Sequence, residues 1–414
     1  MSPTARGGTA RGGTGTNQES VRRHNLGTLL HHVHRAGQIS RAELTSLMAL
    51  NRSTIAALVA ELESLGITEQ TKPSSESRQG AGRPSADVGP SPAGPYVVAV
   101  DVGVDRVVVA RVGLGGAVQR RALSPIVGEP GAQLMAKTIL ELTHEVSADA
   151  PASSALIGIG ISVPGLVRRS DGLVRIAPNL GWRDVPFASM VADELGLGVS
   201  VVIGNDADLG ALAEHERGAG VGLTDLIYVC GNIGVGAGVI AGGARMAGAG
   251  GYAGEVGHLP YLPDGRDCHC GNRGCWETEV GAIAIAKAIG WPLDQVLSLG
   301  EQLDSYTIAP SELRAIGVHL GRGLAMLVNV LNPQVIVLGG YLAALFPLVQ
   351  PEVSQTLHTV ALQAPSESVG LRLPGLGRDS VLLGAAEIAF DDLFVDPVAS
   401  LAQARCDVAT LLGG

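Results

Sequence analysis

Three cysteines and one histidine lie close together in the sequence and carry side chains that bind metal ions. His258 is followed by Cys268, Cys270 and Cys275. One imidazole and three thiolates complete the tetrahedral coordination of Zn²⁺ and leave no open position, as in structural zinc sites. The cluster therefore predicts a structural zinc ion, with the spare donor of the loop, His269, pointing away. The alternative is a group of reduced, buried cysteines that bind no metal.

A second set of polar residues has chemistry suited to binding a sugar. Asn205 and Asp206 follow the apolar run VSVVIG, and residues beyond the carboxyl end of a strand face the crevice where open α/β sheets bind ligands. Asp206 could hydrogen-bond a sugar hydroxyl or accept its proton. Each residue alone is more often an exposed carboxylate or a turn asparagine, but their grouping around one metal loop predicts a polyol site. Its members are Asn179, Asn205, Asp206, Glu255, His258 and Glu277.

The segment GNIGVGAG at 231–238 is rich in glycine. Its backbone amides could cradle a phosphate group. The same composition also suits a close turn between two strands, so this segment alone does not distinguish the two roles.

The elements that would hold these residues indicate an α/β body that begins near Tyr96. The runs YVVAVDVG and RVVVARVG are strand-like and are joined by a tight turn. Strand-like and helix-like segments then alternate along the chain, as in α/β proteins. The uncharged stretch 323–351 is interrupted by Asn332, Pro333 and Gly339, whereas a transmembrane helix needs ~20 predominantly apolar residues. We expect a buried helix, a turn and a buried strand there.

Residues 20–69 favour three helices joined by short turns. Ser40 and Glu43 have the spacing of a capping box for the second helix, and Gly66 ends the third. Apolar residues recur at helical spacing in the first helix, at Val21, Leu26, Leu29, Leu30 and Val33. Four histidines are expected to form its polar face, namely His24, His31, His32 and His34. The apolar stripe of the third helix is Ile55, Leu58, Val59, Leu62 and Leu65.

Three such helices followed by a Gly/Pro/Arg-rich loop fit a winged helix-turn-helix, in which the first turn of the third helix enters the major groove of DNA. Arg52, Ser53 and Thr54 occupy that turn, and Arg78 and Arg83 lie in the expected wing. Residues 1–95 contain ten Arg/Lys and seven Asp/Glu, a net charge of +3, so the remainder carries −13 of the total −10. A basic head on an acidic body suggests that only the head meets a polyanion. The alternative is a helical dimerisation module followed by a solvated linker.

Length and composition set the class of protein. A chain of 414 residues suits two or three domains. With 46% hydrophobic and 16% charged residues, an intrinsically disordered chain is excluded. The N-terminal segment lacks the apolar stretch of a secretory signal and reads as a disordered tail. We expect a cytoplasmic protein that does not enter a membrane.

Taken together, these motifs resemble the ROK family of repressors and sugar kinases. The run from Glu255 to His258, with the following Cys-x-Cys-Gly-x-x-Gly-Cys-x-Glu, is highly specific to that family. The N-terminal helices are similar to the winged helix-turn-helix of its repressor branch, which includes the N-acetylglucosamine and xylose repressors. The resemblance covers roughly residues 20–390, and its other landmarks are Asn205-Asp206, Pro164-Gly165, Asn332-Pro333 and Gly339-Gly340.

The resemblance implies an α+β multidomain protein, in which a winged helix-turn-helix precedes a two-lobed α/β fold of the actin-like ATPase type. It implies one zinc ion at His258, Cys268, Cys270 and Cys275, and a sugar on the six polar residues named above. In the family's kinases, the aspartate that matches Asp206 is the general base. The expected division is a disordered tail at 1–19, the DNA-binding head at 20–85, a linker at 86–95, and the kinase-like domain at 96–414 with its zinc loop at 258–275.

Two departures from the kinase pattern bear on activity. The kinases carry an Asp-x-Gly-Gly-Thr phosphate loop, whereas this chain has Val104 and Asp105 after Asp101-Val-Gly103. A carboxylate ~4 Å from a phosphate costs roughly a few kcal/mol at intermediate dielectric. Ile233 also stands where the second phosphate loop has a threonine hydroxyl. We therefore expect no catalytic residues and no enzyme activity, with Asp206 retained as a vestigial base.

The function predicted from the sequence is a sugar-responsive transcriptional regulator, most simply a repressor. It would bind an inverted-repeat DNA operator as a homodimer or homotetramer, and a sugar in the kinase-like cleft would release or re-orient it. One alternative is an ATP-dependent sugar kinase of the hexokinase or glucokinase type with an accessory DNA-binding head. Another is a constitutive DNA-binding protein with a vestigial sugar cleft.

Overall fold

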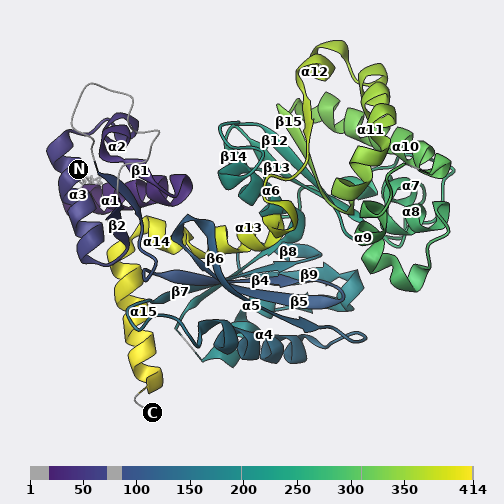
Figure 1. The fold of residues 1–414 in the computed structure, drawn as a ribbon. Helices are drawn as coiled ribbons and strands as arrows, with labels where there is room; N and C mark the ends of the chain where they lie inside the picture. Colours follow the sequence, from purple (N-terminus) through teal and green to yellow (C-terminus); the bar gives the residue numbers. More distant parts are fainter. Residues whose placement is uncertain (1–17, 72–85, 197, 309, 413–414) are drawn as a thin grey trace, which may run out of the picture.

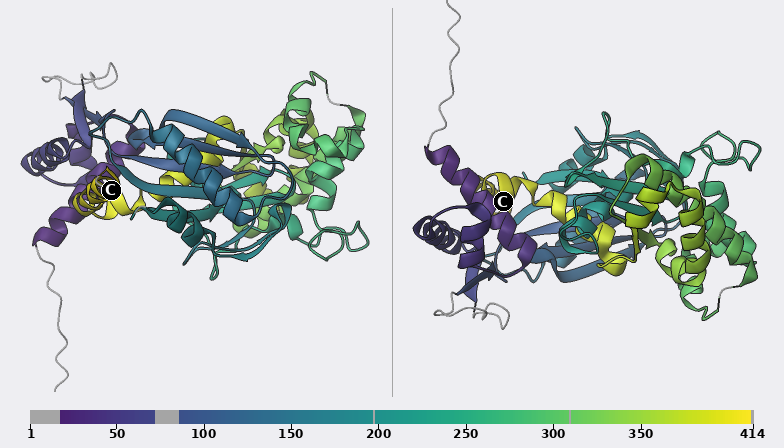
Figure 2. Two further views of the ribbon diagram at one scale, coloured as in Figure 1. Left: turned by 90° about the horizontal axis from the view of Figure 1, so that it is seen from below. Right: turned by 90° about the horizontal axis from the view of Figure 1, so that it is seen from above.

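The computed structural model describes residues 18–71, 86–196, 198–308 and 310–412, without the side chains of Thr71 and of residues 406–412. The chain forms a helical head and two α/β lobes (Figure 1). In Figure 2 the head lies at one end of the molecule, the first lobe in the middle and the second lobe at the other end. The α+β multidomain architecture expected from the sequence is thus confirmed.

The head is a three-helix unit closed by a small sheet. Its antiparallel strands lie in the order β1-β3-β2, so that β3 is the central strand. Its helices are α1 (Gln18–Ala36), α2 (Arg41–Met48) and α3 (Arg52–Ser64), and its strands are β1 (Ile39–Ser40), β2 (Thr68–Thr71) and β3 (Asp87–Pro90). Two strands that flank a loop after the third helix form the wing of a winged helix-turn-helix.

The capping box predicted for the second helix is present, and the third helix is capped as well. The Ser40 side chain accepts a hydrogen bond from the Glu43 amide at 3.2 Å, and Glu43 accepts one from the Ser40 amide at 3.0 Å. Asn51 caps α3 by accepting from the Thr54 amide at 2.8 Å. Four of the five predicted apolar positions of α3 are fully buried and Leu65 is partly buried. In α1, however, Val21 is 45% exposed, because it lies in the first turn, ahead of the part of the helix that packs.

The predicted linker at 86–95 is wrong in its first half. Residues 87–90 form the central strand of the head's sheet, so the head extends to Pro90. The Pro/Gly-rich composition concealed this strand, since Val88 is the only large apolar residue in Asp87–Pro90, and it is completely buried. The first helix starts at Gln18, inside the predicted tail of 1–19, and residues 1–17 lie outside the described part.

The first lobe is built on a five-stranded sheet in the order β11-β7-β4-β5-β6. Helices α4 (Ala132–Ser147) and α5 (Phe187–Leu195) cover one face, and α13 (Ser380–Ala389) covers the other (Figure 1). Strands β4, β7 and β11 run parallel, so their carboxyl ends meet at one edge. The strands are β4 (Tyr96–Val102), β5 (Arg106–Gly113), β6 (Ala117–Pro125), β7 (Leu156–Val163) and β11 (Ser200–Asn205). Between β7 and α5 lies a smaller sheet of β8 (Leu166–Arg168), β9 (Leu173–Ala177) and β10 (Trp182–Val185).

The second lobe repeats this plan with a sheet in the order β14-β13-β12-β15-β16. Its core forms between the sheet and the long helices α10 (Ser311–Leu331) and α11 (Tyr341–Val360), which pack on each other. The remaining helices are α7 (Glu277–Val280), α8 (Ala282–Ala288), α9 (Leu299–Asp304) and α12 (Gln363–Ser368). The strands are β12 (Leu226–Gly231), β13 (Val235–Ala241), β14 (Ala244–Arg245), β15 (Val335–Gly340) and β16 (Gly370–Arg372).

The uncharged stretch at 323–351 forms the predicted buried helix, turn and strand, but its last part begins a further helix that was not predicted. It contains the end of α10, a turn at Asn332 and the buried strand β15, followed by part of α11. In the part of the chain that the structure describes, no single helix is long and apolar enough to cross a membrane. Only the segments 277–288 and 293–304, bent by 109° relative to each other, pass that test as a pair, on length and composition.

The last helices of the chain belong with the head. Helices α14 (Asp391–Val395) and α15 (Pro397–Leu412) leave the first lobe and pack beside α1 (Figures 1 and 2). Gly27 of α1 approaches α14 so closely that an added Cβ would lie 1.9 Å from the Phe394 carbonyl oxygen. One hydrophobic core therefore runs from the head into the first lobe and includes Leu30, Leu393 and Leu401. The predicted assignment of everything from 96 to 414 to the kinase-like domain is corrected here.

Candidate functional site

The floor of the site is the edge where the three parallel strands of the first lobe end. Asp101 on β4 lies opposite Ser162 on β7, and Asn205 on β11 lies opposite Val163. The Ser162 hydroxyl donates a hydrogen bond to the Asp101 carboxylate. Burial raises the pKa of Asp101, and the negative charge of Asp105 raises it further. The ends of β4 and β11, on either side of β7, thus place two carboxyl groups, Asp101 and Asp206, at one edge of the sheet, as the position of Asp206 after an apolar strand predicted.

Asn205 holds the start of α6 (Asp206–Arg217), the helix that leaves this edge. Its side-chain oxygen accepts hydrogen bonds from the amides of Ala207 at 2.9 Å and Asp208 at 3.2 Å. Its side-chain nitrogen donates to the Gly165 carbonyl at 3.0 Å. Asn205 is therefore first of all a helix cap that fixes the position of Asp206, with one amide hydrogen left for a ligand.

Asp206 connects the two lobes. The Asn232 side chain, in the turn between β12 and β13, donates to Asp206 Oδ2 at 2.7 Å. Burial raises the pKa of Asp206 to about 6, and the nearby Asp101 charge contributes to that rise, whereas the hydrogen bond from Asn232 opposes it. A carboxyl group with a raised pKa in a partly buried position is typical of a binding or catalytic site. Asn232 lies in the glycine-rich segment 231–238. From the sequence we considered the backbone amides of this segment and missed the Asn232 side chain.

Glu255 and His258 form the rim of the site on the second lobe. Glu255 precedes a short 3₁₀ turn, Val256–His258, and His258 is its last residue, with Nε2 3.9 Å from Glu255 Oε2. Partial burial raises the pKa of Glu255. The nearby His258 lowers this pKa, and the negative charge of Asp206 raises it further. Because the Asp206 charge acts on it, Glu255 lies near the strand-end carboxylates, which face it from the first lobe.

His258 also belongs to the predicted metal cluster. Its Nδ1 atom lies 3.7 Å from Cys268 Sγ, and Cys270 Sγ lies 3.6 Å from Cys275 Sγ. One ligand atom from each of the four residues falls within 4.8 Å of the others. In a tetrahedron with metal–ligand bonds of 2.0–2.3 Å, the ligand atoms are about 3.3–3.8 Å apart. The distances of 3.7 and 3.6 Å therefore match the spacing of a four-coordinate metal site.

A tight loop brings the cysteines together. Gly271 and Gly274 have φ values of +92° and +70°, and an added Cβ on Gly274 would lie 1.5 Å from the Leu262 carbonyl oxygen. These two glycines therefore let the loop fold tightly enough to bring the cysteines together. His269, expected to point away, instead lies with its Nδ1 3.1 Å from Glu277 Oε1 and its ring beside that of His258.

Glu277 joins the metal cluster to the cleft. It is 7% exposed, and its Oε1 accepts from Cys268 Sγ at 3.0 Å and lies 3.6 Å from His258 Nδ1. Its other oxygen faces Gly234, where an added Cβ would lie 2.6 Å away. His258, His269 and Glu277 form a second group whose ligand atoms lie within 4.8 Å of one another. Glu277 is thus held by the cluster more closely than the sequence suggested.

The remaining predicted residues lie elsewhere. Asn179 is exposed in a short turn after β9, and no described contact links it to Asp206. Arg52 and Ser53 are exposed on the first turn of α3 and Thr54 is half-buried there, with the Ser53 hydroxyl donating to Asn51 at 2.7 Å. Arg78 and Arg83 of the expected wing lie outside the described residues.

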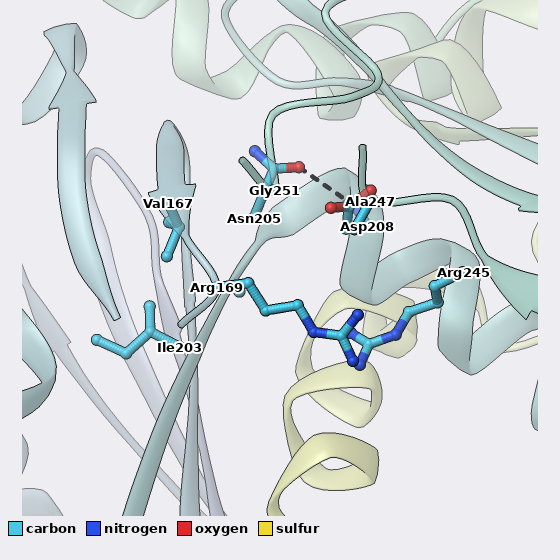
Figure 3. A pocket seen from close by; sticks show the side chains of 9 residues that line it. Val167, Arg169, Ile203, Asn205, Asp208, Arg245, Ala247 and Gly251 are labelled. Atoms are coloured by element: carbon cyan, nitrogen blue, oxygen red, sulfur yellow. Dashed lines mark hydrogen bonds between the residues drawn. The ribbon is translucent and has the colours of Figure 1, made fainter. Parts of the chain in front are cut away.

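A small pocket adjoins Asn205, where the first lobe meets the second (Figure 3). Burial raises the pKa of Asp208 to about 7, while Arg245 lowers it. Burial and the charge of Arg169 lower the pKa of Arg245. The wall consists of Val167, Arg169, Ile203, Gly204, Asn205, Asp208, Arg245, Ala247 and Gly251. The lobes thus meet both at this pocket and at the bond between Asp206 and Asn232.

Comparison with known proteins places this geometry in context. The family model described as "ROK family" matches residues 97–392. The xylose repressor of Bacillus subtilis (strain 168) is 31% identical over 391 residues, which cover 92% of this chain and 98% of that protein. A glucokinase of Halalkalibacterium halodurans is 30% identical over 309 residues, covering 70% of this chain and 93% of that protein.

A solved structure shares the whole architecture. A ROK family transcriptional regulator, described as a homolog of the E. coli MLC protein, superposes with a TM-score of 0.73 and 23% sequence identity. The match covers 92% of this chain and 99% of that one, so the head and both lobes are included.

Proposed function

This chain belongs to the ROK family, and we propose that it is a transcriptional repressor whose binding to DNA responds to a sugar. The observation that carries the proposal is the union, in one chain, of an exposed helix-turn-helix surface and a cleft that joins two lobes at Asp206. The likeness to a named xylose repressor extends over both parts. A protein of this kind needs a head that meets DNA and a body that binds the effector differently in two conformations.

The head supports DNA binding through the first turn of α3. Asn51 caps the helix and thereby fixes Arg52 and Ser53 at its exposed N-terminus. An arginine there can bond a guanine through two hydrogen bonds in the major groove, and a serine hydroxyl can meet a phosphate or a base edge. We propose Arg52, Ser53 and Thr54 as contacts of this helix, and Arg78 and Arg83 as contacts of the wing.

We further propose that the protein acts as a homodimer or homotetramer on an inverted repeat. Two heads related by symmetry read half-sites about 34–36 Å apart or a multiple of that distance. A small rotation of the heads relative to each other then moves one of them out of register, which weakens binding without disturbing either head.

The cleft supports binding of a sugar between the lobes. The sugar hydroxyls would meet Asp206 and Asn205 on the first lobe and Glu255, His258 and Glu277 on the second. Asn179, in the exposed turn after β9, is proposed as a further contact. These side chains offer carboxylate acceptors and a few donors, the polar set that orients a ligand in a concave site. A ligand that touches both lobes favours the conformation in which they are closer.

The cysteine cluster fits a structural zinc ion, with His258, Cys268, Cys270 and Cys275 as ligands. The donor set of three thiols and one imidazole suits Zn²⁺, and its spacing matches tetrahedral coordination. Bound zinc would hold the loop in one conformation. His258 would present Nδ1 to the cluster and Nε2 to Glu255, which would fix the rim of the cleft.

The turn after β4, which corresponds to the first phosphate loop of the family's kinases, argues against kinase activity. In the turn after β4, Asp105 is 2.6 Å from Arg106 through Oδ2, and its charge adds to the burial that raises the pKa of Asp101. A nucleotide phosphate at this turn would meet two carboxyl groups. The likeness to a glucokinase keeps sugar phosphorylation as the competing activity, which a turnover assay must address.

Substitution of Arg52 by alanine should separate the two halves of this function. We expect weaker operator binding by about 1–3 kcal/mol, the cost of losing an arginine that reads a base. Sugar affinity should stay unchanged, because Arg52 lies on the head, away from the cleft. Fluorescence anisotropy with a duplex selected by the wild-type chain, together with calorimetry of sugar binding, measures both. Arg23→Ala, which removes an exposed arginine of α1 whose ion pairs go to Glu19 and Asp396, is the matched control. Equal loss of both activities would contradict the assignment of Arg52 to DNA reading.

A further inference from the structure

A buried ionic cluster joins the head to the first lobe. His34 of α1 is 1% exposed and Glu387 of α13 is 6% exposed, and His34 Nε2 lies 3.0 Å from Glu387 Oε2. Arg217, the last residue of α6, donates through Nε to the other oxygen of Glu387. Arg217 also donates to the backbone carbonyl of His34 at 2.8 Å. The sequence placed His34 on a polar helix face, which is wrong, because Glu387, Arg217 and the rings of Phe390 and Phe394 surround it.

The hydrogen bonds fix the protonation of this cluster. The Gly115 amide donates a hydrogen bond to His34 Nδ1 at 3.1 Å, so Nδ1 is the acceptor of the ring. The ring proton is therefore on Nε2, which donates a hydrogen bond to Glu387 Oε2. Burial lowers the pKa of His34 and keeps it neutral. Although burial alone would raise the pKa of Glu387, His34 and Arg217 lower it to about 2. The cluster thus consists of an ionised carboxylate, a guanidinium and a neutral imidazole, a geometry-specific arrangement.

Helix α6 connects this cluster to the cleft. It begins at Asp206, which bonds Asn232 of the second lobe, and it ends at Arg217 in the cluster. Glu216, the residue before, pairs with Arg35 of the head at 2.7 Å. A helix of these 12 residues is ~18 Å long at 1.5 Å per residue. Both termini of one helix therefore make polar contacts, one to the second lobe and one to the head.

Close packing keeps α6 from moving independently of its neighbours. An added Cβ on Gly384 of α13 would lie 1.9 Å from the Leu209 carbonyl oxygen of α6. An added Cβ on Gly238 of β13 would lie 2.3 Å from the Ala207 carbonyl oxygen, again of α6. Contacts of backbone on backbone leave little room for sliding, since packed interiors deform as units. A displacement at Asp206 must therefore appear at Arg217.

We propose that α6 transmits occupancy of the cleft to the DNA-binding head, and that Glu387 is the positioning residue that couples the end of α6 to α1. This inference rests on the proposed sugar response. When the lobes close on a ligand at Asp206, α6 shifts together with α13, on which it packs backbone to backbone. Arg217 and Glu387 then carry His34 and the whole of α1 with them, and the heads of an oligomer change their relative orientation.

The alternative is that the cluster only anchors the head. The two roles differ in the coupling between sites, defined as the factor by which saturating sugar weakens operator binding. Coupling in allosteric proteins is typically about 5- to 150-fold. An anchor whose loss merely destabilises the fold leaves that factor unchanged in the molecules that remain folded.

The test uses Glu387→Gln in the full chain, with D-xylose and N-acetylglucosamine as probes. Operator affinity is measured by anisotropy with and without sugar, and sugar affinity by calorimetry. We expect sugar affinity to stay within about twofold of wild type, while coupling falls from the range of about 5- to 150-fold to below about twofold. Arg23→Gln is the matched control, since it removes an exposed bond from α1 to Asp396 at 3.1 Å without touching α6, and should keep wild-type coupling.

Glu216→Gln provides a second variant that leaves the buried cluster intact. It removes the pair with Arg35 at the same end of α6, so we expect coupling to fall by part of the loss seen with Glu387→Gln. Wild-type coupling in folded Glu387→Gln and in Glu216→Gln would overturn the inference and leave the sugar response standing. If neither probe changes operator binding by the wild-type chain, the proposed sugar response itself is contradicted for these sugars.

Discussion

Serine in place of Cys275 should remove stoichiometric zinc from the protein and lower its melting temperature. Cys275 is 1% exposed, and its sulfur lies 3.6 Å from that of Cys270. Because the position is buried, a ligand from solvent cannot reach the metal in place of the lost thiolate. Loss of an outer-shell partner alone costs a metal site about 10- to 100-fold in affinity, and loss of a thiolate ligand should exceed that. Elemental analysis after dialysis and a thermal melt measure the two effects.

The same substitution should weaken sugar binding through the rim of the cleft. Without the ion, His258 loses the constraint on Nδ1, and the Nε2 that faces Glu255 is no longer fixed. Cys230→Ala is the matched control, because Cys230 is equally buried but lies in β12, outside the cluster. That variant should keep its zinc. One zinc ion per chain retained by Cys275→Ser would contradict the assignment of the cluster as a four-ligand site.

Asparagine in place of Asp206 should abolish the response to sugar and leave operator binding intact. An ionised acceptor contributes about 1.5–3 kcal/mol to a hydrogen bond, which corresponds to roughly 10- to 150-fold in affinity. The substitution keeps the shape of the side chain and one oxygen for Asn232. Calorimetry gives the sugar affinity, and anisotropy gives the operator affinity with and without sugar. Asp208→Asn, in the same first turn of α6, controls for the loss of a carboxylate at the helix N-terminus.

The pH dependence of sugar binding is an independent test of the role of Asp206. The pKa of Asp206 is raised to about 6, so the carboxylate that accepts from a sugar hydroxyl is present above this pH and protonated below it. Sugar affinity of the wild-type chain should therefore fall as the pH is lowered through 6, and Asp206→Asn should lack this step. A variant that binds sugar as tightly as wild type at pH 7.5 would remove Asp206 from the site.

Features set by residues close together in the chain were predictable. The spacing of Cys268, Cys270 and Cys275 with two glycines already determines a loop that gathers three sulfur atoms, and the capping box at Ser40 depends on four consecutive residues. The carboxyl ends of parallel strands meet by topology, so the place of Asp206 after an apolar strand also indicated the cleft. Local patterns of this kind do not depend on how the lobes pack.

Features set by distant residues were not predictable. His34 and Glu387 are 353 positions apart, and only the return of the C-terminal helices brings them together. Val88 belongs to a strand because β2 pairs with it, although the residues next to it in the sequence are typical of a linker. The amide of Asn205 indicated a ligand contact, but the local need of α6 for a cap occupies most of its hydrogen-bonding capacity.

The central claim is that a sugar in the cleft controls the head without being phosphorylated. One titration tests it: operator affinity of the wild-type chain is followed by anisotropy as D-xylose, D-glucose or N-acetylglucosamine is added with MgATP present, and the sugar is then recovered and analysed. The account predicts that at least one sugar weakens operator binding by about 5- to 150-fold and is recovered unchanged. Operator binding that stays constant while a sugar saturates the cleft, or steady conversion of that sugar to its phosphate, would contradict it.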